Sequence, residues 1–259
     1  MTILKKMTLV LAVGGGLNSL PAIAADFEFD RPGDGMSTTV TPVGRVAWEQ
    51  SLPNFSYREF KNASGLKGNE LGLSADVLLR TGLAEDLELQ LGWAGPAWTK
   101  TRFQGQHRED DGLGDVSIGV KKLIDLNDEK LSLAVLAQAQ IATGNDGFTA
   151  HDDIYTIATA VNYLYSDQIT TNITMKYEVQ NSDWAVTAIP TLGYALNENW
   201  SGYSQFVYRK AESQDYEYGL GSGVIYALND RVQLDASIGL DLSGSDKNYN
   251  VGLGFSYLF

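Results

Sequence analysis

The chain of 259 residues has no cysteine and only two histidines. The lack of cysteine excludes disulfide scaffolds, thiolate metal sites and thiol nucleophiles. Positive charge is also scarce, because 19 lysines and arginines face 32 acidic residues and leave a formal net charge of −13. Nucleic-acid binding needs a basic footprint, so the composition excludes this class of function.

Long hydrophobic runs are absent as well. The apolar stretch Met7–Val13 is well short of the roughly 20 residues that a membrane-spanning helix needs. It follows two lysines and precedes a small-residue site that ends at Ala24, which is the pattern of a secretory signal peptide. We therefore expect residues 1–24 to be a signal peptide. Its removal takes away two lysines and no acidic residue, so the net charge moves from −13 to −15.

The last strand of the chain is the most informative segment that is present. In residues 248–259, apolar and aromatic side chains alternate with Asn, Gly and Ser, apart from Leu258. An apolar row on a soluble edge strand would invite aggregation, whereas a closed barrel in lipid requires it. A core strand of a soluble β-sandwich is the alternative. We expect Tyr257 and Phe259 to form an assembly signal for the barrel-assembly machinery.

Short turns and longer polar connections alternate along the chain, which is typical of outer-membrane barrels with extracellular long loops. The pattern predicts an all-β fold, a transmembrane antiparallel up-and-down β-barrel of about 12 strands over residues 44–259, with both termini periplasmic. Residues 25–43 are expected to be an N-terminal lead-in or a partial plug. The expected strands are 44–53, 70–82, 87–96, 113–124, 130–142, 153–165, 169–179, 184–195, 200–209, 216–227, 232–242 and 248–259.

The faces of these strands separate charge from apolar side chains. The residues assigned outward on strands 87–96, 169–179 and 232–242 are uncharged. This bias has a physical cause, because a cationic side chain at the bilayer midplane costs about 2–4 kcal/mol. Strand 200–209 fits neither register well, and Pro190 removes a ladder hydrogen bond from strand 184–195.

The inward charged residues are the candidate pore lining. They indicate either a water-filled pore or a salt-bridged interior, and 12 strands lie between the filled 8-stranded barrels and the open barrels of 16–18 strands. Six acids against four bases predict a mild cation preference. The candidates are Arg45, Glu49, Asp76, Arg80, Glu88, Lys121, Lys176, Glu178, Asp235 and Asp241.

Two other classes of function stay open. The protein could be a structural or adhesive barrel with a plugged lumen, or a hydrolase that uses His107 or His151 at the extracellular rim. No serine lies in a nucleophile motif and no metal-binding spacing occurs, so we expect no catalytic residue, no metal and no cofactor. The acidic run Glu109–Asp111 could bind Ca²⁺ that bridges to lipopolysaccharide.

Several motifs together resemble one known family. They are Asp30-Arg31-Pro32, Leu79–Leu89, Gly112–Lys121, Leu234–Gly239 and Val251–Tyr257. In combination they are similar to the outer-membrane transporters grouped as the MetA-pathway of phenol degradation family, over about Asp30 to Phe259. This resemblance implies a barrel channel for passive transport of small molecules, often aromatic or hydrophobic compounds, and no catalytic residues. The partners we expect are outer-membrane lipid, lipopolysaccharide and small-molecule solutes.

Overall fold

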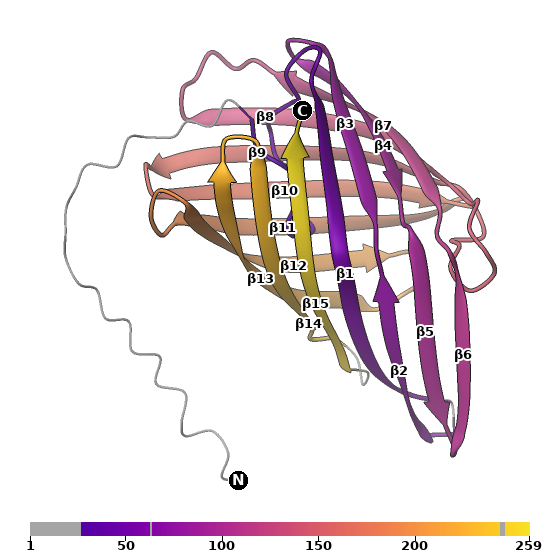
Figure 1. The fold of residues 1–259 in the computed structure, drawn as a ribbon. Coiled ribbons are helices and arrows are strands. Elements are labelled where there is room, and N and C mark those ends of the chain that lie inside the picture. Colours follow the sequence, from indigo (N-terminus) through magenta and orange to yellow (C-terminus); the bar gives the residue numbers. More distant parts are fainter. Residues whose placement is uncertain (1–26, 63, 244–246) are drawn as a thin grey trace.

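Twelve antiparallel strands close into a barrel in the computed structural model, which describes residues 27–62, 64–243 and 247–259 (Figure 1). The expected fold class is confirmed, and the expected signal peptide lies outside the described residues. The barrel closes where β15 pairs with β1, from Ala47 opposite Leu258 to Glu59 opposite Lys247. The barrel strands are β1 (Val46–Lys61), β3 (Val77–Ala84), β4 (Leu87–Trp93), β7 (Val116–Ile124), β8 (Leu131–Ile141), β9 (Ile154–Ser166), β10 (Ile169–Gln180), β11 (Asp183–Ala195), β12 (Trp200–Ala211), β13 (Tyr216–Asn229), β14 (Val232–Asp241) and β15 (Lys247–Leu258).

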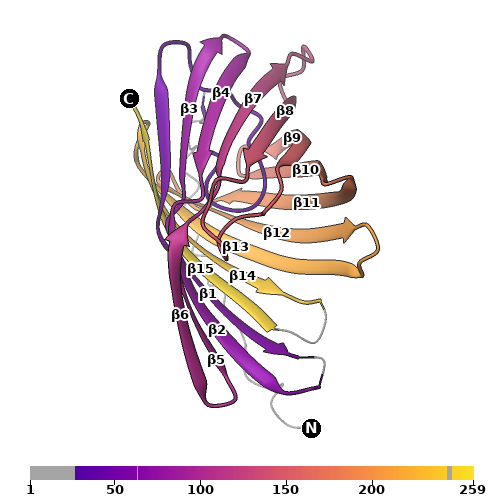
Figure 2. The ribbon, with the colours of Figure 1, turned by 90° about the vertical axis from the view of Figure 1, so that its right-hand side faces the viewer.

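Three further strands extend the sheet beyond the barrel. The outer half of β1 pairs with β2 (Lys67–Ser74), β2 pairs with β5 (Pro96–Phe103), and β5 pairs with β6 (Gln106–Leu113). Figure 2 shows this extension projecting past one end of the barrel. We call these four strand segments, with β1 counted from Asn54, the extension sheet.

The extension sheet corrects two expectations. The segments Pro53–Gly68 and Gly95–Asp111, expected as loops, are largely strands, and the expected strand 70–82 is two strands separated by Ala75 and Asp76. The reason is that apolar alternation arises only where one face meets lipid or a core. Where both faces of a strand meet water there is no such alternation, and β6, which is polar except for Gly112 and Leu113, gives no such signal.

The barrel wall alternates as expected. On β4 the inward Glu88 and Gln90 are buried, whereas the outward Leu91 and Trp93 are exposed. No helix among the described residues is long and apolar enough to cross a membrane. Pro190 lies opposite Ile173, and the ladder between β11 and β12 is interrupted there without an extra residue on either strand.

The two ends of the barrel differ. The C-terminal strand ends beside the start of β1, at the end where short turns join β3 to β4, β9 to β10 and β13 to β14. The opposite end carries the extension sheet and the longer connection between β8 and β9. Because short turns face the periplasm in outer-membrane barrels, we expect the extension sheet to lie on the extracellular side.

Candidate functional site: the barrel lumen

The segment before β1 lies inside the barrel. Residues 27–43 contact inward side chains of strands on opposite walls, and Val43 forms an isolated parallel bridge with Gly82 of β3. A side chain at position 82 would collide with this segment, because its Cβ would lie 2.2 Å from the carbonyl oxygen of Thr41. We call residues 27–43 the inner segment.

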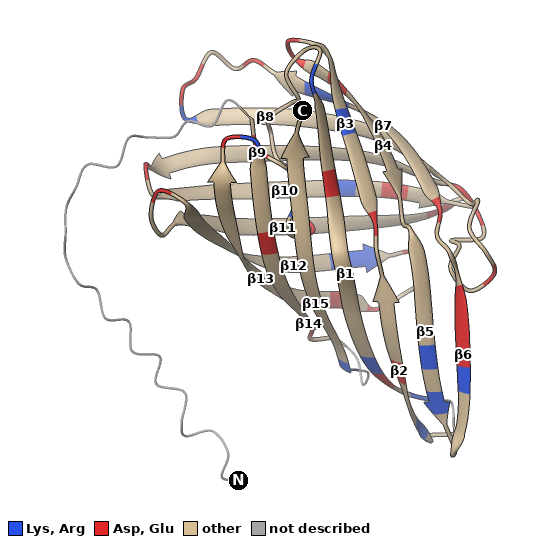
Figure 3. Ribbon diagram, viewed as in Figure 1, with Lys and Arg blue, Asp and Glu red and all other residues tan. Residues whose placement is uncertain are grey.

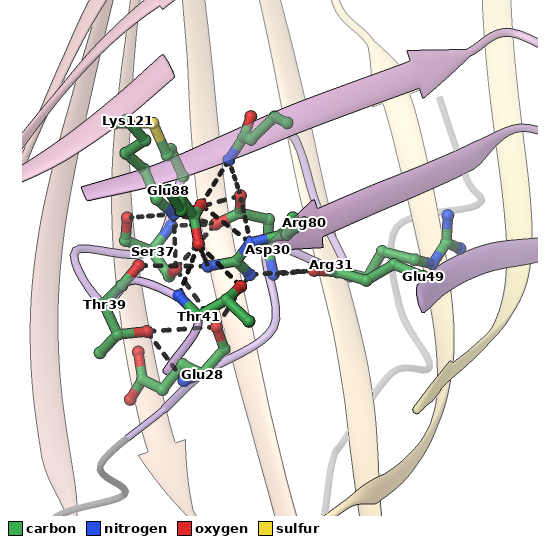
Figure 4. A network of polar contacts seen from close by, with 12 residues as sticks. Glu28, Asp30, Arg31, Ser37, Thr39, Thr41, Glu49, Arg80, Glu88 and Lys121 are labelled. Carbon is green, nitrogen blue, oxygen red and sulfur yellow. Dashed lines mark hydrogen bonds and ion pairs between the residues drawn. The ribbon is translucent and has the colours of Figure 1, made fainter. Parts of the chain in front are cut away.

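A buried arginine joins the inner segment to the wall (Figure 4). The guanidinium of Arg80 pairs with Glu49 at 2.9 Å and with Glu88 at 2.9 Å, and none of these three side chains is exposed. It also donates hydrogen bonds to the carbonyl oxygens of Glu28 at 3.0 Å and Thr39 at 3.1 Å. Strands β1, β3 and β4 thus bind the inner segment through one cation.

Lys121 of β7 completes this network. Its ammonium group lies 3.2 Å from Asp30 Oδ1 and 3.2 Å from Glu88 Oε1, and its side chain is also fully buried. Glu88 in turn accepts hydrogen bonds from the backbone N–H of Thr41 at 2.6 Å and from its hydroxyl at 2.8 Å. Gln90 donates to both Asp30 and Glu88. Three carboxylates thus face two cations, and each of these charged groups has at least one partner of opposite sign, which is the condition for burying it.

Arg31 reaches the wall next to this network. Its guanidinium lies 3.4 Å from Asp76 and 3.5 Å from Asp235, and it donates a hydrogen bond to the carbonyl of Leu253 at 3.4 Å. Gly254 leaves the room for this contact, because a Cβ there would lie 2.5 Å from the Asp235 carboxylate and 2.6 Å from Arg31 Nε.

The far wall of the barrel holds the other side of the inner segment. Met36 packs against the small inward residues Ala134, Ala158 and Ala160 and against Leu136 of β8 and β9. Thr174 of β10 accepts a hydrogen bond from the Met36 N–H at 3.0 Å, and Thr38 and Ser132 form a hydrogen bond of 2.7 Å. Gln205 of β12 exchanges hydrogen bonds with Asp34. The inner segment therefore crosses the lumen from wall to wall.

The extracellular half of the lumen carries charges that the inner segment does not cover. Lys176, Thr187, Arg209 and Glu217 follow one another across neighbouring strands, and Arg209 pairs with Glu217 at 3.0 Å. Glu178 is half-buried one inward position further out on β10. Figure 3 shows charged residues along these strands. We call Lys176, Glu178, Thr187, Arg209 and Glu217 the polar vestibule.

The expected lining residues therefore divide into groups. Glu49, Arg80, Glu88 and Lys121 meet around Asp30, whereas Asp76 and Asp235 meet around Arg31. Lys176 and Glu178 lie in the vestibule, and Asp241 accepts hydrogen bonds only from Ser243 within the described residues. Arg45 precedes β1, and its carbonyl accepts a hydrogen bond from Thr81.

Sequence reasoning missed the residues that organise the lumen. Asp30 and Arg31 precede the first strand, so no strand periodicity could place them. The only signal for them was the Asp-Arg-Pro motif of the family resemblance. Arg209 was not predicted as a lumen residue because the sequence of β12 fitted neither register, so its side chain could not be assigned to the inward face.

The C-terminal residues lie at the barrel seam. Phe259 donates its backbone N–H to the carbonyl of Val46 at 2.9 Å, and its ring meets that of Tyr257 with centroids 4.6 Å apart. The ring of Phe259 is 54% exposed, as expected of a side chain that faces lipid.

The extracellular rim is anchored by Asp115, which lies between β6 and β7. Burial raises the pKa of this carboxyl, but hydrogen bonds from the backbone N–H groups of Ala150 and Gly144 and from Gln140 outweigh burial and hold the pKa at about 2. The rim connection between β8 and β9 therefore depends on a charged carboxylate.

The two histidines lie outside the groups of interacting side chains described above. The side chains of His107 on β6 and His151 between β8 and β9 form no hydrogen bond or ion pair with the described residues. Within the same ranges, no group of three or more His, Cys, Asp or Glu residues could hold a metal ion.

Comparisons with known proteins agree with this architecture. The model of the family described as "Putative MetA-pathway of phenol degradation" matches residues 29–259. The COG4313 outer membrane channel from Pseudomonas putida F1 aligns with a TM-score of 0.67 at 14% identity, over 88% of this chain and 99% of that chain. No curated protein gives a significant match.

Two more distant barrels are also similar. The translocator domain of the autotransporter NalP from Neisseria meningitidis aligns with a TM-score of 0.55 at 9% identity, over 83% of this chain and 88% of that chain. The KdgM porin in complex with disordered oligogalacturonate aligns with a TM-score of 0.50 at 11% identity, over 78% of this chain and 98% of that chain. At these identities the likeness shows the fold alone.

Proposed function

The chain belongs to the MetA-pathway of phenol degradation family, and from this premise we propose that it is an outer-membrane channel through which small solutes diffuse passively. The observation that carries the proposal is the combination of an apolar outer face with a lumen lined by charged and polar side chains. A barrel that served only as a membrane anchor would not need the half-exposed ion pair of Arg209 and Glu217 in its interior.

The inner segment sets the width of this channel. Its contacts lie near the short-turn end, because Glu88, Ser132 and Asp235 all stand within four residues of the periplasmic end of their strands. The path therefore narrows from the vestibule toward the periplasm. A narrow path is selective by size, and this supports uptake of small molecules rather than polymers.

The lining favours solutes with polar groups. Arg209, Glu217 and Asn172 offer donors and acceptors in the lumen, whereas Thr187 and Tyr203 are buried. A small compound with a hydroxyl or carboxyl group would find hydrogen-bond partners for that group. The family description, which refers to phenol degradation, agrees with this class of solute.

Planar-bilayer conductance of the purified full-length protein tests the proposal. We expect small unitary steps with a mild preference for cations, because acidic side chains outnumber basic ones among the candidate lining residues. A variant that lacks residues 27–43 but keeps the signal peptide should conduct several-fold better.

One observation favours a second function, a barrel closed by its own N-terminal segment. The inner segment is held by a network of buried ion pairs. If the intact protein does not conduct and the shortened variant does, the native state is closed and opens only when the segment moves. Absence of conductance in both proteins would contradict the channel proposal.

A further inference from the structure

On the outward face of the extension sheet, paired residues of neighbouring strands form rows, and the type of side chain differs from one row to the next. Strand pairing places Val251, Phe55, Leu73 and Trp98 side by side, and this row continues the lipid-facing surface of the barrel. The next row outward holds Tyr249, Tyr57, Leu71 and Lys100. Apolar side chains thus give way to tyrosines, as they do where a barrel leaves the hydrocarbon layer.

Basic residues follow directly beyond the tyrosines. The third row holds Lys247, Glu59, Asn69 and Arg102, and in the fourth row Lys61 lies opposite Lys67. Basic residues outnumber the single acidic residue, Glu59, in these two rows. The side chains of Lys61, Lys67 and Arg102 are exposed and form no ion pair with the described residues. Figure 3 shows basic residues gathered toward the outer ends of these strands. We call Lys61, Lys67 and Arg102 the basic trio.

The other face of the same sheet is different. Arg58 pairs there with Glu70 at 3.3 Å, and Arg108 pairs with Asp110 at 2.7 Å, so its basic residues are neutralised locally. Within the described part of the extension sheet, the basic residues without an ion pair lie on the face that is continuous with the lipid-facing wall. On β6 that face also holds Asp111, and Glu109, which pairs with Lys100 at 2.6 Å.

We propose that the basic trio binds the phosphate groups of lipopolysaccharide in the outer leaflet. Three features support this partner: the face continues the lipid-contacting surface, the charge is opposite to that of phosphate, and the tyrosine row places the trio just beyond the hydrocarbon layer. Basic side chains at this height attract anionic headgroups within about a Debye length. The lipid would hold the extension sheet upright against the outer leaflet.

Binding of bisphosphorylated lipid A to the full-length protein in neutral detergent tests this, with bound lipid counted by native mass spectrometry. We expect the variant K61Q/K67Q/R102Q to bind at least tenfold more weakly than the wild type. The matched control R58Q/R108Q removes two basic residues from the opposite face and should change binding less than twofold. Lipid A without phosphates should bind the wild type as weakly as the bisphosphorylated lipid binds the triple variant.

Two outcomes would overturn the proposal. The first is equal binding of bisphosphorylated lipid A by the wild type and the triple variant, including binding that requires Ca²⁺ and is lost with a chelator, since that would assign the contact to acidic residues such as Glu109. The second is wild-type binding that does not weaken between 50 and 500 mM salt. This second measurement needs no variant and so does not depend on the variant folding.

Discussion

At the scale of single residues, the lumen shows how a membrane barrel keeps buried charge. A guanidinium removed from water needs several acceptors, and Arg80 has two carboxylates within 2.9 Å and two backbone carbonyls. The ring of Phe27 lies 4.8 Å from its central carbon and covers one face of the group. Loss of this cation would leave Glu49 and Glu88 buried close to each other without their main partner.

Replacement of Arg80 by methionine is therefore expected to lower the free energy of unfolding by about 3–5 kcal/mol. Urea unfolding in detergent, followed by heat-modifiable migration on a gel, measures this change. The control is Arg58→Met, which removes a solvent-exposed pair worth below about 1 kcal/mol. Equal effects of the two substitutions would show that the buried network does not hold the barrel.

Asp115 leads to a prediction about pH. The pKa of this carboxyl is about 2 in the folded protein, below the value of about 3.9 for an unperturbed Asp. A lowered folded-state pKa stabilises the protein above the unfolded pKa, and that stabilisation is lost as the pH falls through the folded value. We expect Asp115→Asn to cost about 1–3 kcal/mol at pH 7, and the difference from wild type to vanish near pH 2. A difference in urea midpoint that is the same at both pH values would contradict this assignment.

At the scale of elements, close backbone approach decides where the inner segment lies. Gly82 is inward-facing on β3, and the carbonyl oxygens of Thr41 and Pro42 pass directly over it. Glycine is required here for space rather than for an unusual dihedral angle. The position of the segment therefore depends on the missing side chains at Gly82 and Gly254 of the wall as well as on its ion pairs.

The substitution Gly82→Ala is expected to displace residues 41–43 and to raise single-channel conductance while the barrel stays folded. Its Cβ would lie 2.2 Å from the Thr41 oxygen, a distance that only a backbone shift can relieve. Gly239→Ala is the matched control, because the added Cβ would meet its nearest neighbour, Asn250, at an ordinary 3.6 Å. Unchanged conductance in Gly82→Ala would show that the segment does not limit the path.

The seam between β1 and β15 gives a second prediction at this scale. Phe259→Asp would place a charge where the ring now faces lipid next to Val46 and Tyr257. We expect the amount of folded protein in the membrane to fall severalfold, whereas Phe259→Tyr should keep it near the wild-type level. Normal membrane yield of the aspartate variant would show that the terminal aromatic is not needed for assembly.

At the scale of the whole molecule, the barrel is asymmetric between its two ends. One end has tight turns and both the inner segment and the C-terminus, and the other has the vestibule and the extension sheet. The asymmetry assigns a direction in the membrane, which places the basic trio outside the cell and the narrow part of the lumen near the periplasm.

This orientation can be checked with single cysteines, because the native chain has none. Ser64→Cys, in the turn between β1 and β2, should react with a membrane-impermeant maleimide on intact cells. Glu198→Cys, in the short turn between β11 and β12, should react only after the outer membrane is opened. The reverse pattern of labelling would invert the orientation.

The sequence by itself determined the barrel. Lipid on one side and water on the other impose an alternation that strands such as β4, β10 and β14 record residue by residue, and the turns between strands are local. It also placed Glu49, Arg80, Glu88 and Lys121 on the inward face, because that assignment needs only the strand period.

Only the tertiary structure decided which charged side chains form ion pairs with one another. The inner segment has no regular alternation of apolar and polar residues from which its position could be predicted. The pairing of Asp30 with Lys121 also joins residues that are 91 positions apart in the sequence. The extension sheet was missed for a related reason. Its outer rows and most of β6 are polar on both faces, so the apolar alternation stops before the strands end, and the pairing of these strands is decided by the register of their neighbours.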